Sequence, residues 1–182
     1  MTKTVCWIHG AYSSDRAFNY LRTKLPSHRR LVFEYDVRTP LELNLESLSQ
    51  LLDSITVDGI VGHSLGGVMA ALMVKREYAP RGVAIASPLG GFPVANFFPL
   101  TQLLVDVAST RPTFTELKAH NFEDKLLNIV ASYDGRWTDG VVPVNSQLSV
   151  KTDLVEKVHM NHFEVLLDEK IGEMINDHIF KK

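Results

Sequence analysis

The sequence predicts an α/β fold, a mostly parallel sheet with helices on both of its faces. Short apolar runs rich in β-branched residues recur along the chain, and stretches with helical spacing alternate with them. The runs are almost continuously apolar, as in strands that are buried on both sides, and parallel strands need a crossover that a helix supplies. With 182 residues, 45% hydrophobic and 22% charged, the chain is expected to form a single domain covering residues 1–182.

Six strands are expected, and each is a short apolar run that ends in polar or glycine-rich residues. They lie at residues 5–9, 31–37, 59–63, 83–86, 127–133 and 154–158. Five helical stretches separate or follow them, at 14–25, 43–55, 64–78, a less regular 95–107, and 162–179. Pro26 follows the first helical stretch, and Pro80 and Gly82 follow the third, which supports these boundaries.

Composition and charge exclude several classes of function. The formal charge of −2 argues against a nucleic-acid partner, because phosphate neutralisation needs a basic surface. The longest apolar region, 90–108, is interrupted by prolines and polar residues, so no membrane span is expected. The chain enters its first strand within a few residues of Met1, without a secretory pattern, which predicts a cytoplasmic protein. Cys6 lies inside an apolar run and is expected to be a buried, unreactive thiol.

The most informative stretch is the G-x-S-x-G sequence of residues 62–66, which joins an apolar strand to a helix of small residues. A serine at such a turn adopts a tight backbone conformation, and Gly62 and Gly66 remove the Cβ atoms that would block it. The Ser64 hydroxyl would then project above the sheet. The helix that starts behind it would direct backbone N–H groups, beginning with that of Leu65, at negative charge forming beside Ser64.

A second piece of chemistry is expected where the first strand ends. Gly10 allows the chain to turn sharply and to expose successive backbone N–H groups, of which that of Ala11 would be a second oxyanion donor. His9 is expected to shape this loop. Ligands of open α/β sheets bind at the carboxyl ends of the strands, and this loop and Ser64 would be neighbours there if the first and third strands are adjacent.

An activated serine needs a base, and the base needs an acidic group to orient it. The loop after the fifth strand offers Asp134 and Asp139, and the segment after the sixth offers His159 and His162. The residues alone leave both choices open. His63, next to the serine, is interpreted as a packing or hydrogen-bonding residue. His28, His120 and His178 have polar neighbours and are expected to face solvent.

This arrangement resembles the α/β-hydrolase superfamily, in particular its small lipase-like and esterase-like members. The order Ser, Asp, His matches the family, and residues 8–11 and 62–66 are similar to its oxyanion loop and nucleophile elbow. The family's acid usually precedes an apolar-Val-Pro run, which implies Asp139 rather than Asp134. Its histidine sits just ahead of a helix that opens with apolar residues, which implies His162. The resemblance implies a reduced sheet of six parallel strands in the order 4-3-5-6-7-8 of the family's strand numbering.

Residues 88–112 form an unusual apolar stretch with four prolines. The family commonly places a cap or the wall of an acyl pocket here, which implies that Phe97, Phe98 and Leu104 line a cleft. The alternative, that these side chains only complete the core, stays open. No metal-ligand spacing and no phosphate-cradling loop occurs in the sequence, so we expect neither a metal nor another cofactor.

The sequence therefore predicts a serine hydrolase that cleaves carboxylic esters with an apolar acyl or alcohol part through an acyl-enzyme. In this hypothesis Ser64 attacks, His162 is the base, Asp139 orients it, and the N–H groups of Ala11 and Leu65 hold the oxyanion. A thioesterase or acyltransferase would use the same residues. A non-catalytic interaction protein on the same scaffold is the alternative from another class. The sequence does not predict the oligomeric state.

Overall fold

The computed structural model describes residues 2–92 and 101–180, in which one sheet organises the chain. Six strands form this sheet, every neighbouring pair is parallel, and the order is β2-β1-β3-β4-β5-β6. This is the order that the resemblance implied, so that prediction is confirmed. The strands are β1 (Thr4–Ile8), β2 (Arg29–Phe33), β3 (Gly59–His63), β4 (Gly82–Ile85), β5 (Leu126–Ala131) and β6 (Leu154–Val158).

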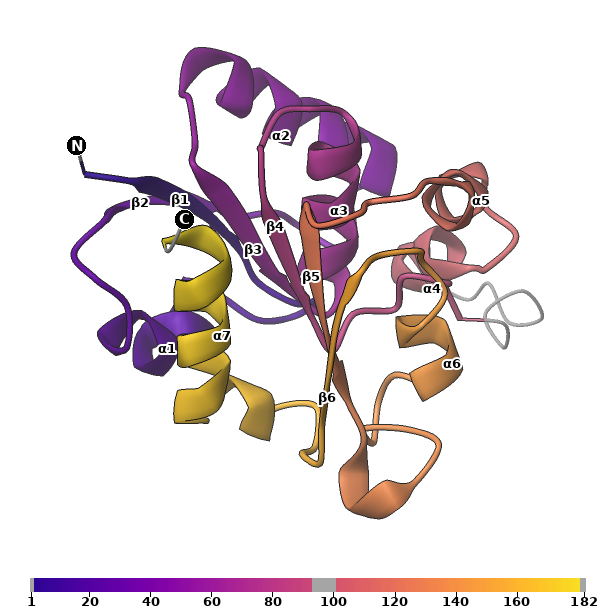
Figure 1. The fold of residues 1–182 in the computed structure, drawn as a ribbon. Helices are drawn as coiled ribbons and strands as arrows, with labels where there is room; N and C mark the ends of the chain where they lie inside the picture. The colour runs from indigo at the N-terminus through magenta and orange to yellow at the C-terminus, as the bar shows by residue number, and fades with distance from the viewer. Residues whose placement is uncertain (1, 93–100, 181–182) are drawn as a thin grey trace.

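Helices cover both faces of the sheet (Figure 1). One face packs against α1 (Asn19–Thr23) and α7 (Glu169–Ile179), and the other packs against α2 (Leu41–Ser54), α3 (Leu65–Lys75) and α5 (Pro112–Ala119). The remaining helical segments are short: η1 (Asp15–Phe18), α4 (Gln102–Val107), η3 (Tyr133–Gly135), α6 (Val144–Gln147) and η4 (Glu164–Leu166).

The alternation of side chains along β1 explains why both faces need a cover. Val5 and Trp7 pack into the core beneath α1 and α7, whereas Cys6 and Ile8 pack into the core beneath α2 and α3. All of these side chains are buried, because successive residues of a strand point to opposite faces. Burial also raises the pKa of the Cys6 thiol to about 12, which agrees with an unreactive cysteine.

Several strands and helices begin or end at other residues than predicted. The second strand ends at Phe33 and the fifth at Ala131, each earlier than predicted, because the apolar run continues into the loop that follows. The last helix begins only at Glu169, after the short turn η4, so His162 precedes it. α5 and α6 were not predicted. Across residues 2–92 and 101–180, every helix is too short or too polar to cross a lipid bilayer.

The topology gathers four loops at one edge of the sheet. Because all six strands are parallel, their carboxyl ends meet there, and the loops after β1, β3, β5 and β6 carry every chemistry-bearing residue that the sequence singled out.

Candidate active site

Ser64 occupies a sharp turn between β3 and α3. Its backbone angles are φ 53° and ψ −124°, which few residues other than glycine adopt. Its N–H donates to the Ile85 carbonyl at 2.9 Å, and its own carbonyl accepts from the Gly67 N–H at 3.0 Å. A Cβ at Gly62 would lie 2.1 Å from the Gly66 carbonyl oxygen, so the turn closes only with glycine there. The sequence motif therefore builds the strained turn that it predicts.

The loop after β1 lies directly against this turn. A Cβ added at Gly10 would lie 3.1 Å from the Ser64 Cβ. Ala11, Ser64 and Leu65 line one pocket, and the N–H groups of Ala11 and Leu65 have no hydrogen-bond acceptor among the described residues. Leu65 is the first residue of α3, where a backbone N–H lacks an intrahelical partner. Two unused amide donors therefore lie beside the serine.

His9 orients the peptide that carries one of these donors. Its Nδ1 donates to the Gly10 carbonyl at 2.7 Å, and its Nε2 lies 2.8 Å from a carboxylate oxygen of Glu34. The ring also stacks on Tyr35, with centroids 4.7 Å apart. The Gly10 carbonyl and the Ala11 N–H belong to one planar trans peptide, so holding the carbonyl on one side directs the N–H to the other. His9 thus shapes the loop, as the sequence suggested.

Asp139 and His162 form a buried pair. Asp139 Oδ2 lies 2.7 Å from His162 Nδ1, which donates to it, and the His162 N–H donates to the Asp139 carbonyl at 2.9 Å. The other carboxylate oxygen, Oδ1, accepts from the N–H groups of Val141 and Val142 at 2.8 and 2.6 Å. Asp139 is 0% exposed and His162 is 4% exposed. The pair is therefore shielded from water and fully hydrogen-bonded on its acidic side.

Asp134 and His159, the other candidates for the acid and the base, lie away from this buried pair. Asp134 is exposed in the turn η3, with a backbone φ of 52°, and His159 is exposed just after β6. Neither is brought to the buried pair. The separation of the two aspartates arises because the chain folds back between them, where Tyr133 N–H donates to the Thr138 carbonyl at 3.0 Å.

Gln147, which the sequence analysis did not single out, holds the loop of residues 132–143 that carries Asp139, which we call the acid loop. It is 0% exposed in α6, its Oε1 accepts from the Ala131 N–H at 2.8 Å, and its Nε2 donates to the Ala131 carbonyl at 2.9 Å. The same Nε2 lies 3.4 Å from Asp139 Oδ2. Gln147 therefore joins the end of β5 to the carboxylate. Its sequence context, a short polar segment after Pro143, gives no sign of this position.

His63 connects the serine turn to the histidine loop. Its Nε2 donates to the His162 carbonyl at 2.8 Å, and the two imidazole rings lie 4.6 Å apart between centroids. Burial, and to a smaller extent the nearby His162, lower the pKa of His63 from 6.5 to about 3. His63 is therefore neutral, with its proton on Nε2. The sequence predicted that His63 packs or hydrogen-bonds locally, but its hydrogen-bond partner lies 99 residues along the chain.

The pocket at Ser64 has a volume of about 180 Å³ and walls that are apolar apart from the serine. Pro88, Phe92, Leu103 and Val107 contribute to it from the apolar 88–112 stretch, and Val141 completes the described lining. Phe97 and Phe98 lie outside the described residues. Leu104 belongs to α4, but its side chain also lies outside what is described.

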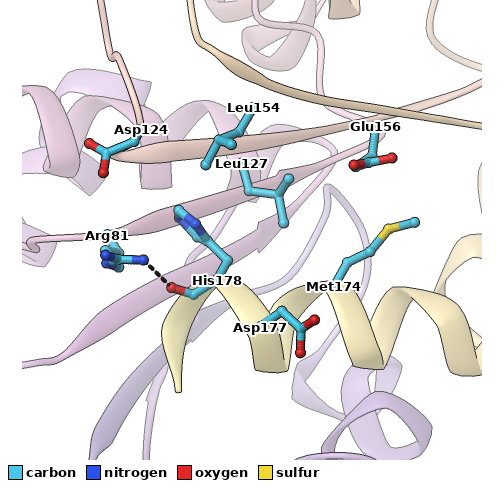
Figure 2. A pocket seen from close by; sticks show the side chains of 8 residues that line it. All are labelled: Arg81, Asp124, Leu127, Leu154, Glu156, Met174, Asp177 and His178. Atoms are coloured by element: carbon cyan, nitrogen blue, oxygen red, sulfur yellow. Dashed lines mark hydrogen bonds between the residues drawn. The ribbon is translucent and has the colours of Figure 1, made fainter. Parts of the chain in front are cut away.

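A different pocket, of about 420 Å³, lies at the opposite edge of the sheet. Leu127 and Leu154 line it from the amino ends of β5 and β6, and Met174 lines it from α7 (Figure 2). Arg81 donates there to the His178 carbonyl at 2.7 Å. His178 is only 6% exposed, so the expectation that it faces solvent is wrong: it lies on the sheet-facing side of α7. None of the predicted site residues lines this pocket.

No group of three or more His, Cys, Asp or Glu side chains within residues 2–92 and 101–180 is arranged to hold a metal ion. The buried His162 and Asp139 instead pair with each other.

The comparison with protein families decides the identity of the scaffold. A model described as "Alpha/beta hydrolase family" matches residues 7–160, from the last two residues of β1 to just past β6. The chain belongs to this family. A sequence comparison with curated proteins finds no match.

Solved structures of a lipase, a carboxylesterase and a thioesterase share the fold at low sequence identity. The mature lipase BlEst2 of Bacillus licheniformis is 11% identical, with a TM-score of 0.63, covering 96% of this chain and 90% of the lipase. Carboxylesterase CesB of Bacillus subtilis is 13% identical, with a TM-score of 0.66, covering 100% of this chain and 85% of CesB. The RedJ thioesterase of Streptomyces coelicolor is 13% identical, with a TM-score of 0.60, covering 96% of this chain and 85% of the thioesterase.

Proposed function

We propose that this alpha/beta hydrolase is a serine esterase that cleaves carboxylic esters with an apolar acyl or alcohol part. The observation that supports the proposal is the buried Asp139–His162 hydrogen bond. The His162 ring lies 4.6 Å, between centroids, from the ring of His63, the residue just before Ser64, and the unused N–H groups of Ala11 and Leu65 lie on the same turn and the neighbouring loop. A nucleophile, a base with its orienting acid, and an oxyanion site are the parts that acyl transfer to serine requires.

The reaction has two halves. Ser64 Oγ attacks the ester carbonyl carbon while its proton passes to His162 Nε2, and the N–H groups of Ala11 and Leu65 hold the resulting oxyanion. His162 then gives the proton to the leaving alkoxide, the carbon–oxygen bond to the alcohol breaks, and Ser64 remains acylated. Water repeats the sequence with His162 as base, which releases the acid and restores Ser64. Asp139 keeps the His162 proton on Nδ1 and stabilises the imidazolium in each half.

Two further residues support this reaction by position. His63 is neutral and donates to the main chain of His162, so it fixes the loop of the base without adding a second positive charge beside it. His9 fixes the peptide of the Ala11 donor. The apolar walls of the pocket at Ser64 favour an apolar acyl group over a charged one, because a charged group would lose its hydration there.

Thioester cleavage or acyl transfer to another acceptor would use the same residues, and a thioesterase is among the structures that share the fold. A panel of p-nitrophenyl esters, from acetate to dodecanoate, tests the ester assignment directly. We expect turnover by the wild-type protein and a loss on the order of 10⁴-fold or more in Ser64→Ala. Ser47→Ala, on the exposed side of α2, is the matched control and keeps full activity. Turnover that survives in Ser64→Ala would refute the proposal.

A further inference from the structure

A second, larger cavity adjoins the pocket at Ser64. It has a volume of about 800 Å³, and its lining is mostly apolar, with Phe92, Trp137, Pro143, Val144 and Leu148 among its walls. We call it the outer groove. It lies between the acid loop with α6 on one side and the start of the 88–112 stretch on the other.

Phe92 belongs to both cavities. Its side chain is a wall of the pocket at Ser64 and also a wall of the outer groove. The acid loop likewise serves both, because Val141 lines the pocket at Ser64 whereas Pro143 and Val144 line the outer groove. The two cavities are therefore adjacent and separated by the Phe92 side chain, with the outer groove on the side away from the serine.

The shared wall is anchored on both sides. The Phe92 N–H donates to the Val107 carbonyl at 2.6 Å, and Phe92 pairs with Ala108 in a parallel bridge. The loop just before it is tied to α6, because the Gly90 N–H donates to the Ser146 carbonyl at 2.8 Å and the Ser146 hydroxyl donates to the Gly91 carbonyl at 2.6 Å. The main chain at Phe92 is thus tied both to the end of α4 and to α6.

The size of the inner pocket limits what it can hold. A methylene group is close to a water molecule in size and occupies about 30 Å³, so the inner pocket of about 180 Å³ holds roughly six carbon atoms of an acyl chain. The remainder of a longer acyl chain would have to continue in water or in the next apolar space, and the outer groove is that space.

We propose that the outer groove is a second subsite, which binds the distal carbons of a long-chain acyl group whose carbonyl carbon lies at Ser64. The chain fills the inner pocket first and then passes over Phe92 to contact Val144 and Leu148. This inference rests on the proposed esterase function and gives it a substrate class: esters of long-chain, unbranched acids.

Leu148 offers a test that leaves the catalytic residues untouched. It is 37% exposed and lines only the outer groove among the described cavities. A polar replacement should be tolerated, because more than a third of the side chain already contacts water. Leu148→Asp places a charge where the distal chain would lie. Leu43→Asp, at a residue 50% exposed on α2, is the matched control for the same chemical change at a remote surface.

The expected result is a change in chain-length preference. Each buried methylene contributes roughly a fourfold gain in kcat/KM. We expect Leu148→Asp to lower kcat/KM for p-nitrophenyl dodecanoate about tenfold or more and to leave that for the butyrate within about twofold. Leu43→Asp changes neither value. A series of acetate esters with lengthening alcohols should respond equally in all three proteins, because the groove receives the acyl chain.

Three outcomes separate the possible failures. If the wild-type protein hydrolyses no ester, the proposed function falls and this inference falls with it. If the wild-type protein is active but Leu148→Asp and Leu43→Asp behave alike on dodecanoate, the esterase stands and the second subsite is refuted. If Leu148→Asp lowers butyrate and dodecanoate hydrolysis equally, the residue affects the site as a whole, which also refutes a distal subsite.

Discussion

Replacing Asp139 by Asn tests the acid directly, because the structure dictates how the amide would sit. Asp139 Oδ1 accepts two backbone N–H groups, from Val141 and Val142, and an amide NH₂ there would face two donors. The Asn oxygen must therefore occupy the Oδ1 position. Its NH₂ group then faces His162 Nδ1, which lies 2.7 Å from Oδ2 in the native pair.

This orientation forces the wrong tautomer on the histidine. An NH₂ donor requires Nδ1 of His162 to accept, so the imidazole proton moves to Nε2, where it blocks uptake of the Ser64 proton. We expect kcat to fall on the order of 10⁴-fold, which corresponds to about 5.4 kcal/mol of transition-state stabilisation. Both backbone hydrogen bonds survive in the variant, so the protein should still fold cooperatively, as judged by urea denaturation.

Asp134→Asn is the matched control, since Asp134 is exposed in the η3 turn. Its turnover of a p-nitrophenyl ester should stay within about twofold of the wild-type rate. The reasoning would be refuted if Asp139→Asn kept more than a tenth of the activity, or if Asp134→Asn lost as much.

Three other predictions concern the surroundings of the serine. His63→Leu removes the side-chain N–H that donates to the His162 carbonyl, and it should lower kcat about tenfold or more at nearly constant KM. His63→Gln keeps an N–H donor and should recover most of the lost kcat. Equal losses in the two variants would refute a positioning role for this hydrogen bond. The pKa of His63 falls from 6.5 to about 3 on folding, so below pH 6.5 the unfolded chain binds a proton that the folded chain does not. The contribution of His63 to the free energy of unfolding is therefore greatest above pH 6.5 and declines by up to about 1.4 kcal/mol per pH unit below it. Urea titrations in which His63→Gln shows an equally steep decline would contradict this. Gly62→Ala places a Cβ 2.1 Å from the Gly66 carbonyl oxygen and should lower the free energy of unfolding by more than about 2 kcal/mol. Gly135→Ala, where the Cβ enters open space, should cost about 1 kcal/mol. Similar melting temperatures for the two variants would refute the close approach at Gly62.

The Ser64 turn illustrates what local sequence can predict. An apolar strand, glycines on either side of the serine and a helix of small residues are all encoded within about ten positions, and the observed φ of 53° follows from them. The alternation of strands and helices predicted the parallel sheet in the same way. The strand order required the family resemblance, since the residues alone do not say which strands pair.

The choice between the aspartates came from the family resemblance, because the chemistry of the two residues alone does not separate them. Asp134 and Asp139 lie five positions apart in one loop, and only the backbone fold of that loop buries one and exposes the other. Gln147 and His63 were underestimated for a related reason. Their partners are set by contacts between distant segments, Gln147 with the end of β5 and His63 with a carbonyl 99 residues away. Hydrogen bonds of this kind leave no periodic or spacing signal.

Labelling with a fluorophosphonate tests the central claim most directly, because such a probe reacts with a serine only where a base and an oxyanion site activate it. The account predicts a single adduct by intact mass, mapped to the peptide that contains Ser64. The adduct should be absent from Ser64→Ala, and its formation should be strongly slowed in His162→Ala. A folded wild-type protein that stays unmodified, or an adduct on any other residue, would contradict it.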